Sequence, residues 1–227
     1  IDLQSGKFRE GRPDELLSKA SPIDWVGLDA PAKAWEAWLL EIFDGDEDLV
    51  RYIQRVFGYA IAGLTLEHIF VVLHGRGRNG KGTFVEILNH ILGPLSGSIQ
   101  SEMLLTTRQP RSSAGPSPDI IGLKGLRLAF ASETDEGQRF SPAKVKLYTG
   151  GDQLVGRSPH DKYEVRFKPT HTLCLLTNHK PHAPGDDFAF WERVHLVPFN
   201  LSFVAREPVQ DNERRARQGV AQELMKE

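Results

Sequence analysis

Residues 69–92 read IFVVLHGRGRNGKGTFVEILNHIL, and this stretch decides the fold class. Its first five residues form a continuous apolar run rich in β-branched side chains, which is typical of a strand buried on both faces. A loop with four glycines follows at once. Beyond the loop, apolar residues recur at helical spacing up to a stop at Gly93-Pro94; they are Phe84, Ile87, Leu88, Ile91 and Leu92. Strand, glycine loop and helix in this order predict a phosphate-binding loop in an α/β protein.

The loop satisfies every fixed position except the last of the pattern G-x-x-x-x-G-K-[ST]. In that pattern backbone N–H groups surround phosphates and the lysine contacts the β and γ oxygens. A purely structural glycine turn is the alternative. The flanking helix favours the phosphate site, because a helix N-terminus directs its positive dipole at an anion. The predicted nucleotide-binding residues are Gly75, Arg76, Gly77, Arg78, Asn79, Gly80, Lys81, Gly82 and Thr83.

The last position of the pattern departs from expectation. Gly82 stands where a hydroxyl that binds magnesium normally lies, and Thr83 is the nearest hydroxyl. We therefore take Thr83 as a candidate Mg²⁺ ligand. One step along a helix turns a side chain by about 100°, so direct replacement by Thr83 does not follow from the sequence.

The rest of the chain divides into three predicted segments. Residues 1–65 contain a turn-rich lead-in and two amphipathic helices, in which Trp35 and Trp38 share a stripe with aliphatic residues and are interpreted as core anchors. Residues 66–205 interleave buried strands with helices, which predicts a parallel α/β sheet; this segment carries the phosphate-binding loop and is taken as the P-loop core. Residues 206–227 are polar and are expected to form a C-terminal helix that belongs to a longer protein.

Composition narrows the classes of protein. The chain has 227 residues and a net charge of −2, which neither indicates nor excludes nucleic-acid binding, because a local group of basic residues is sufficient. Cys174 is the single cysteine, so disulfides and a zinc site built on cysteines are excluded, and a reducing, cytoplasmic location is expected. No apolar run approaches the roughly 20 residues that span a bilayer, and no membrane partner is expected.

Three further sets of polar residues are candidates for catalysis. Glu133 and Asp135 follow the apolar run RLAFAS, at the carboxyl end of a predicted strand, where phosphoryl-transfer sites hold Mg²⁺ and orient water. Asn178 closes the strand HTLCLLTN and could contact a water or the γ-phosphate, although a turn-forming asparagine is the alternative. Arg193 begins the strand RVHLVPF and could neutralise charge on a neighbouring subunit's nucleotide; a surface ion pair is the alternative.

Five stretches of the sequence, taken in order, resemble the superfamily 3 helicase domain of phage and plasmid primase-helicases, which is related to the poxvirus-type primase-helicases. They are GRGRNGKGTF, RLAFASETDEG, KLYTGGDQLVGR, LLTNHKP and DDFAFWERVHLVPF. The resemblance covers nearly the whole chain. It implies an AAA+-like P-loop core that assembles as a ring, usually a hexamer, and hydrolyses ATP at subunit interfaces to move along single-stranded or forked DNA. It also implies a phage or prophage source and a primase or polymerase domain elsewhere in the full-length protein.

The resemblance assigns roles to individual residues. Lys81 would bind the β- and γ-phosphates, Glu133 would act with Mg²⁺ and the attacking water, Asn178 would sense the γ-phosphate, and Arg193 would be the finger acting in trans. The stretch from Lys146 to Lys162 corresponds to the region around the family's DNA-binding hairpin. DNA contacts are expected from Lys146, Arg157, His160 and Lys162. An exposed turn without function is the alternative for His160 and Lys162; in a ring, their charges would be repeated about sixfold.

Two rival functions remain open from the sequence. A small-molecule P-loop kinase would act as a monomer and ignore DNA. A catalytically degenerate DNA-binding ring module would explain Gly82 and would show no turnover. The acidic sequence Glu133-Thr134-Asp135 also lacks two adjacent carboxylates, so the carboxylate that holds Mg²⁺ is not assigned.

Overall fold

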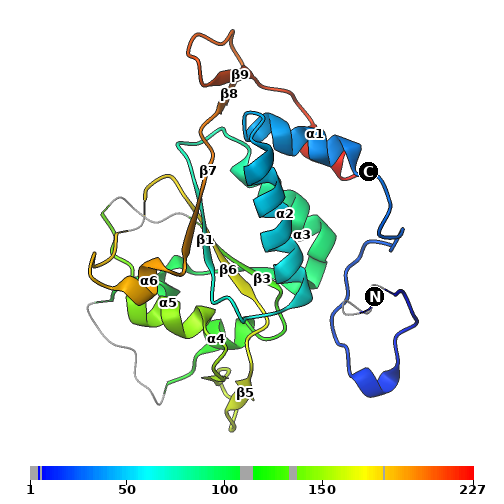
Figure 1. The fold of residues 1–227 in the computed structure, drawn as a ribbon. Coiled ribbons are helices and arrows are strands. Elements are labelled where there is room, and N and C mark those ends of the chain that lie inside the picture. Colours follow the sequence, from blue (N-terminus) through cyan, green and yellow to red (C-terminus); the bar gives the residue numbers. More distant parts are fainter. Residues whose placement is uncertain (1–4, 6, 108–114, 133–136, 181) are drawn as a thin grey trace.

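The computed structural model describes residues 5, 7–107, 115–132, 137–180 and 182–227. At its centre lies a five-stranded sheet in the order β2-β3-β6-β1-β7, in which every neighbouring pair is parallel (Figure 1). The strands are β1 (Phe70–His74), β2 (Ser96–Ile99), β3 (Leu128–Ser132), β6 (Thr172–Thr177) and β7 (Val194–Pro198). The predicted α/β fold with a central parallel sheet is confirmed.

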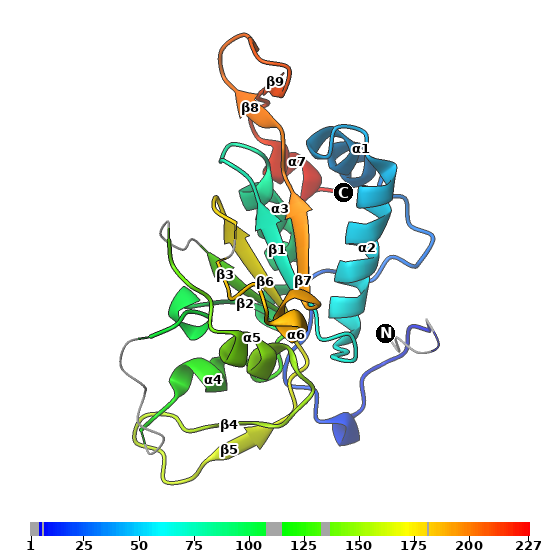
Figure 2. The same ribbon diagram turned by 60° about the vertical axis from the view of Figure 1, so that its left-hand side comes forward.

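Helices cover both faces of the sheet, as parallel strands require. One face is covered by α1 (Lys33–Ile42), α2 (Glu47–Ala62) and α3 (Lys81–Leu92), and the other by α4 (Pro118–Gly122), α5 (Pro142–Thr149) and α6 (Phe188–Trp191). Figure 2 shows the two helical layers on opposite sides of the strands.

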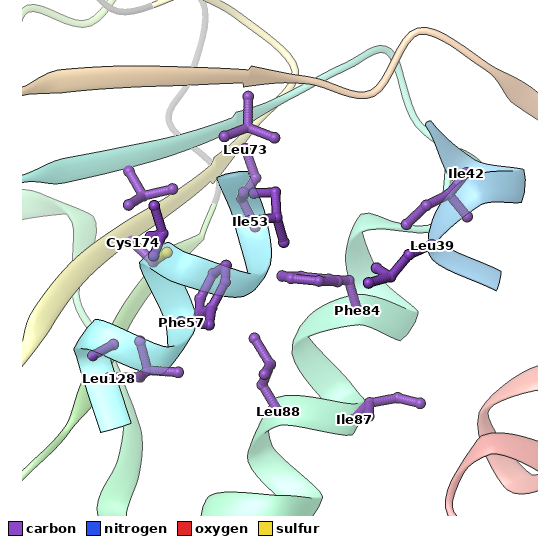
Figure 3. Packing of buried hydrophobic residues seen from close by; sticks show 14 of the residues in the cluster. Leu39, Ile42, Ile53, Phe57, Leu73, Phe84, Ile87, Leu88, Leu128 and Cys174 are labelled. Carbon is purple, nitrogen blue, oxygen red and sulfur yellow. The ribbon is translucent and has the colours of Figure 1, made fainter. Parts of the chain in front are cut away.

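Successive side chains of each strand point to opposite faces of the sheet, so the buried side chains are divided between two cores. Val71 and Leu73 of β1 point to the α1–α3 side, whereas Phe70 and Val72 point to the α4–α6 side. In the first core, α2 and α3 meet the sheet around Phe84 (Figure 3). Trp38 is buried in this core and Trp35 packs against it, which confirms their interpretation as core residues.

The two predicted N-terminal helices, α1 and α2, are present, and α2 is capped at both ends. Asp46 lies in the turn between them and accepts a hydrogen bond at 2.9 Å from the backbone N–H of Leu49, capping α2. Gly63 ends α2 in the left-handed conformation.

Three features were not expected from the sequence. Strand β2 has the sequence SGSI, without an apolar run. The expected C-terminal helix over 206–227 is wrong in its extent, because α7 covers only Val220–Leu224 and a parallel ribbon of β8 (Ser202–Val204) and β9 (Glu213–Arg215) occupies the segment before it. Short 3₁₀ turns also occur, at Pro13–Glu15 (η1), Gly93–Leu95 (η2) and Ser101–Met103 (η3).

The region that the resemblance relates to a hairpin does contain one, the antiparallel pair of β4 (Leu154–Gly156) and β5 (Val165–Phe167). It lies at the end of the molecule opposite the β8–β9 ribbon (Figures 1 and 2). Within the described residues, no helix is both long enough and apolar enough to cross a membrane.

His171 makes the fold sensitive to acid. Its side chain is 2% exposed, and its Nε2 lies 3.0 Å from the backbone oxygen of Tyr148. Burial lowers the pKa of His171 to about 4, so the ring is neutral in the folded protein below the ordinary histidine pKa of 6.5. The unfolded chain therefore binds the extra proton first, and the free energy of unfolding falls as the pH drops from 6.5 towards 4.

We expect His171 to contribute about 2–3 kcal/mol to the loss of stability between pH 7.5 and 4.5. Urea unfolding of the wild type and of His171→Gln at the two pH values measures the free energy of unfolding. The difference between the two proteins separates the contribution of His171 from that of the other titrating groups. An equal loss in both proteins would contradict the prediction.

Candidate nucleotide site

The glycine-rich loop joins the carboxyl end of β1 to the first turn of α3 and is pinned by backbone contacts. The N–H of Gly75 donates to the oxygen of Thr177 on β6 at 3.2 Å. A Cβ at Gly75 would overlap Asn79 and Phe199, so only glycine fits there. Gly77 and Gly80 have φ of +100° and +88°, in the left-handed region that favours glycine. Gly75, Gly77 and Gly80 are thus required by the path of the loop.

Lys81 and Asn178 meet beneath this loop. Lys81 is 7% exposed, and its Nζ donates to the backbone oxygen of Gly75 and, at 3.2 Å, to Oδ1 of Asn178. The two residues are 97 positions apart but lie at the carboxyl ends of the adjacent strands β1 and β6. The sequence singled out each residue separately, and the structure brings them together.

The first turn of α3 provides the remaining elements of an anion site. The first N–H groups of a helix have no partner within it, and the helix dipole makes this end positive. A Cβ at Gly82 would meet no heavy atom within 4 Å, so a larger side chain would fit at this position. Thr83, one residue further on, faces a cavity next to the loop.

This cavity has a volume of about 390 Å³, within the ~300–1,000 Å³ range of small-molecule sites. Gly80 and Thr83 line it on the side of the phosphate loop. Its other walls come from α1, α3, β8 and the segment before and within α7; they include Trp38, Glu41, Ile42, Glu86, Phe203, Arg217 and Gln222. Its position next to the loop fits the nucleoside part of a nucleotide whose phosphates lie on that loop.

In the loop, Arg76 and Arg78 are exposed, and Asn79, which follows them, is buried. The backbone oxygen of Arg78 accepts a hydrogen bond at 2.6 Å from the N–H of Phe203, and Nδ2 of Asn79 donates to the oxygen of Phe199 at 3.3 Å. The chain that follows β7 therefore holds the outer side of the loop. Arg76 is exposed and open to a ligand or another molecule.

His74, the last residue of β1, lies beside these groups. Burial, reinforced by the positive charges of Lys180 and Lys81, lowers the pKa of His74 below its ordinary value. The imidazole is therefore neutral at neutral pH, and the buried positive charge beneath the loop belongs to Lys81 rather than to His74.

The predicted acidic residues Glu133 and Asp135 lie outside the described residues. Strand β3 ends at Ser132, one residue before them, and pairs with β6. Within the described part of the chain, no group of three or more histidine, cysteine, aspartate or glutamate side chains could hold a metal ion.

Arg193 lies at the edge of the sheet opposite the phosphate loop. It directly precedes β7, and its backbone oxygen accepts a hydrogen bond at 2.7 Å from Phe70, the first residue of β1. Its Nη1 donates to the oxygen of Ala189, while its Nε is buried and has no partner among the described residues. The structure does not bring Arg193 to the phosphate loop of its own chain.

The four candidate DNA-binding residues fall into two places. His160 and Lys162 are exposed in the loop of the β4–β5 hairpin, and Arg157 directly follows β4 and donates to the oxygen of Asp161 at 3.0 Å. Lys146 lies instead on α5, where its Nζ pairs with Asp187 at 3.0 Å. Arg157, His160 and Lys162 thus lie together at the hairpin, and Lys146 belongs to the α5–α6 contact.

Sequence reasoning missed the walls of the cavity. Glu41 and Arg217 form an ion pair at 2.7 Å across 176 positions of sequence, and both line the cavity. Neither residue belongs to a recognisable pattern. The one signal that could have found them is the opposite charge of two amphipathic segments. Many pairs of surface segments have opposite charges, so this signal does not single out Glu41 and Arg217.

Comparison with known proteins places the fold and relates the chain to viral proteins. No family model matches. Two similar proteins carry names beginning "Putative helicase": L207/L206 of Acanthamoeba polyphaga mimivirus, 30% identical over 206 residues and 90% of this chain, and 022R of Frog virus 3, 25% identical over 205 residues and 89% of this chain. In each case the match covers 21% of the relative. The chain thus spans about a fifth of the length of these relatives.

Among solved structures, the apo C-terminal region of NrS-1 is similar, with a TM-score of 0.59 and 16% identity. The match covers 86% of this chain and 43% of that one. At this identity the likeness concerns the fold. Together with the parallel sheet and the loop after β1, it identifies a core like that of P-loop nucleotide hydrolases.

Proposed function

We propose that this chain is the ATP-hydrolysing module of a DNA helicase of the superfamily 3 type. The observation that carries the proposal is the arrangement at the end of β1, where Lys81 lies under the glycine loop, bonded to Asn178, with a cavity of nucleoside size alongside. The helicase names of the viral relatives support the same reading. Single-stranded or forked DNA is the proposed partner, contacted by the exposed hairpin around His160 and Lys162.

The nucleotide is proposed to be ATP with Mg²⁺. Magnesium prefers oxygen ligands and usually binds through one or two carboxylates together with substrate phosphates. Thr83 lines the cavity next to the loop, and Glu133 follows the strand beside β6 in sequence. These two residues and the nucleotide phosphates are the proposed ligands, and Asp135 is the second acid available to orient water.

A ring of identical subunits, with six as the expected number, is proposed from the position of Arg193. Arg193 and the phosphate loop lie at opposite ends of the paired strands β7 and β1. The two ends are five residues apart along the strands, or about 16 Å. An arginine there serves a nucleotide only on a neighbouring molecule, in a head-to-tail contact that closes into a ring. Light scattering with a non-hydrolysable ATP analogue and single-stranded DNA tests the expected sixfold molar mass.

Stimulation of ATP hydrolysis by single-stranded DNA tests the proposed function. We expect Mg-ATP turnover to rise at least several-fold with single-stranded DNA, and this rise to weaken with salt as phosphate contacts are screened. Lys81→Ala protein, assayed in parallel, controls for contaminating ATPases. Turnover indifferent to DNA, together with phosphate transfer to a small acceptor, would instead identify a kinase. DNA binding without turnover would identify a degenerate ring module.

A further inference from the structure

The cavity beside the phosphate loop is closed by two segments from opposite parts of the chain. One is α1, which supplies Trp38, Glu41 and Ile42. The other is the segment 216–227, named here the C-terminal clasp, whose residues 216, 217 and 219–222 complete the wall. Figure 2 shows α7, the helical part of the clasp, beside α1 and α3. The shape of the cavity therefore depends on the distance between α1 and the clasp.

Glu227 holds one end of the clasp to α1. Its two carboxylate oxygens accept hydrogen bonds from the backbone N–H groups of Ala34 and Trp35, each at 2.9 Å. These groups belong to the first turn of α1, whose own N-cap residue, Ala32, offers no side-chain acceptor. The same hydrogen bonds lower the pKa of Glu227, as expected of a carboxylate that is stabilised as an anion.

Arg217 holds the other end. Its Nη2 donates to Oε2 of Glu41 at 2.7 Å, and its Nη1 lies 4.0 Å from Glu223 on α7. Both Arg217 and Glu41 line the cavity, so this ion pair is part of the wall itself.

Between these two attachments the clasp and α1 are loosely packed. A second cavity of about 200 Å³ lies between them, lined on one side by Ala34, Ala37 and Trp38 and on the other by Val220, Glu223 and Leu224. Of the apolar residues of α7, Ala221 and Leu224 are buried and Val220 is half-buried. Since the space between α1 and the clasp is incompletely filled, the polar contacts at its ends help to set the separation of the two segments.

We infer that Glu227 and Arg217 are positioning residues that set the affinity of the site for nucleotide by holding α1 and the C-terminal clasp together around the nucleoside. This inference rests on the proposed function. Because a bound nucleoside would touch both α1 and the clasp, binding and clasp closure favour each other by the same factor. The phosphate loop is anchored separately, to β6 and to the chain after β7, so its grip on the phosphates does not depend on the clasp.

The test compares ATP with tripolyphosphate, which occupies a phosphate loop but has no nucleoside. In Glu227→Ala protein we expect the KM for ATP to rise about five- to tenfold, the size of effect that removal of a helix cap produces. The kcat at saturating ATP and the inhibition constant of tripolyphosphate should stay within about twofold of the wild type. Arg217→Met should give the same pattern, and Arg217→Lys should restore part of the affinity.

Glu36→Ala is the matched control, because Glu36 is an exposed carboxylate in the same first turn of α1 and its loss changes the net charge equally. It should leave the KM unchanged. An unchanged KM in both Glu227→Ala and Arg217→Met would overturn the inference, as would a parallel rise in the inhibition constant of tripolyphosphate, since the whole site would then be loosened. Failure of the wild type to bind ATP would instead reject the proposed function.

Discussion

Replacing Lys81 by alanine is expected to abolish ATP hydrolysis, with a loss of at least about 100-fold in kcat. The ammonium group is the positive charge held under the loop, since His74 is neutral at neutral pH. In the nucleotide complex it would neutralise charge that develops on the β- and γ-phosphates. Single-turnover hydrolysis of radiolabelled ATP measures the loss directly.

Two variants separate the charge of Lys81 from its packing. Lys81→Met keeps the length of the buried side chain without its charge and should be as inactive as the alanine variant. Lys124→Ala removes an exposed lysine far along the chain and should retain wild-type turnover. Thermal unfolding confirms that each protein is folded. Wild-type activity in a folded Lys81→Met protein would refute the assignment of the loop.

Loss of Arg193 is expected to reduce turnover by about 1,000-fold, the lower end of the effect of arginine fingers. The physical reason is its place at the opposite edge of the sheet, from which it would serve the nucleotide of a neighbour. Arg193→Ala alone should therefore bind ATP while hydrolysing it very slowly.

Mixing two inactive proteins tests whether Arg193 acts across an interface. In an equimolar mixture of Lys81→Ala and Arg193→Ala chains, an interface between an intact lysine and an intact arginine forms at random in at most about a quarter of cases, because head-to-tail contacts pair unlike surfaces. Up to that fraction of wild-type ATPase should return. A mixture of Lys81→Ala with Lys81→Met should show no recovery. Absence of recovery in the first mixture, under conditions where rings form, would count against action in trans.

The sequence predicted those parts of the fold that local pattern determines. The run IFVVL, the glycine loop and the helical spacing after it are contiguous, so their order alone predicts the strand, loop and helix that the structure contains. Strands β3, β6 and β7 were found in the same way. Strand β2 was not, because SGSI has a single apolar residue, Ile99, and pairs at the edge of the sheet with β3 alone.

The parts that depend on distant segments could not be predicted. The contact of Lys81 with Asn178 follows from the placement of β6 next to β1, which periodicity does not specify. The same holds for the cavity, whose walls combine α1 with the C-terminal clasp. The expected C-terminal helix was too long because a polar composition does not distinguish a solvated helix from the ribbon of β8 and β9.

In the proposed helicase, strand β6 would transmit motion between the nucleotide site and the β4–β5 hairpin. Asn178 directly follows its last residue, and residues 168–171 alone separate its first residue from the β4–β5 hairpin. A six-residue strand is about 20 Å long, and this one is hydrogen-bonded to β1 on one side and β3 on the other. Such an element neither stretches nor buckles easily. A displacement of its γ-phosphate end along the strand axis would therefore move the hairpin by nearly the same distance.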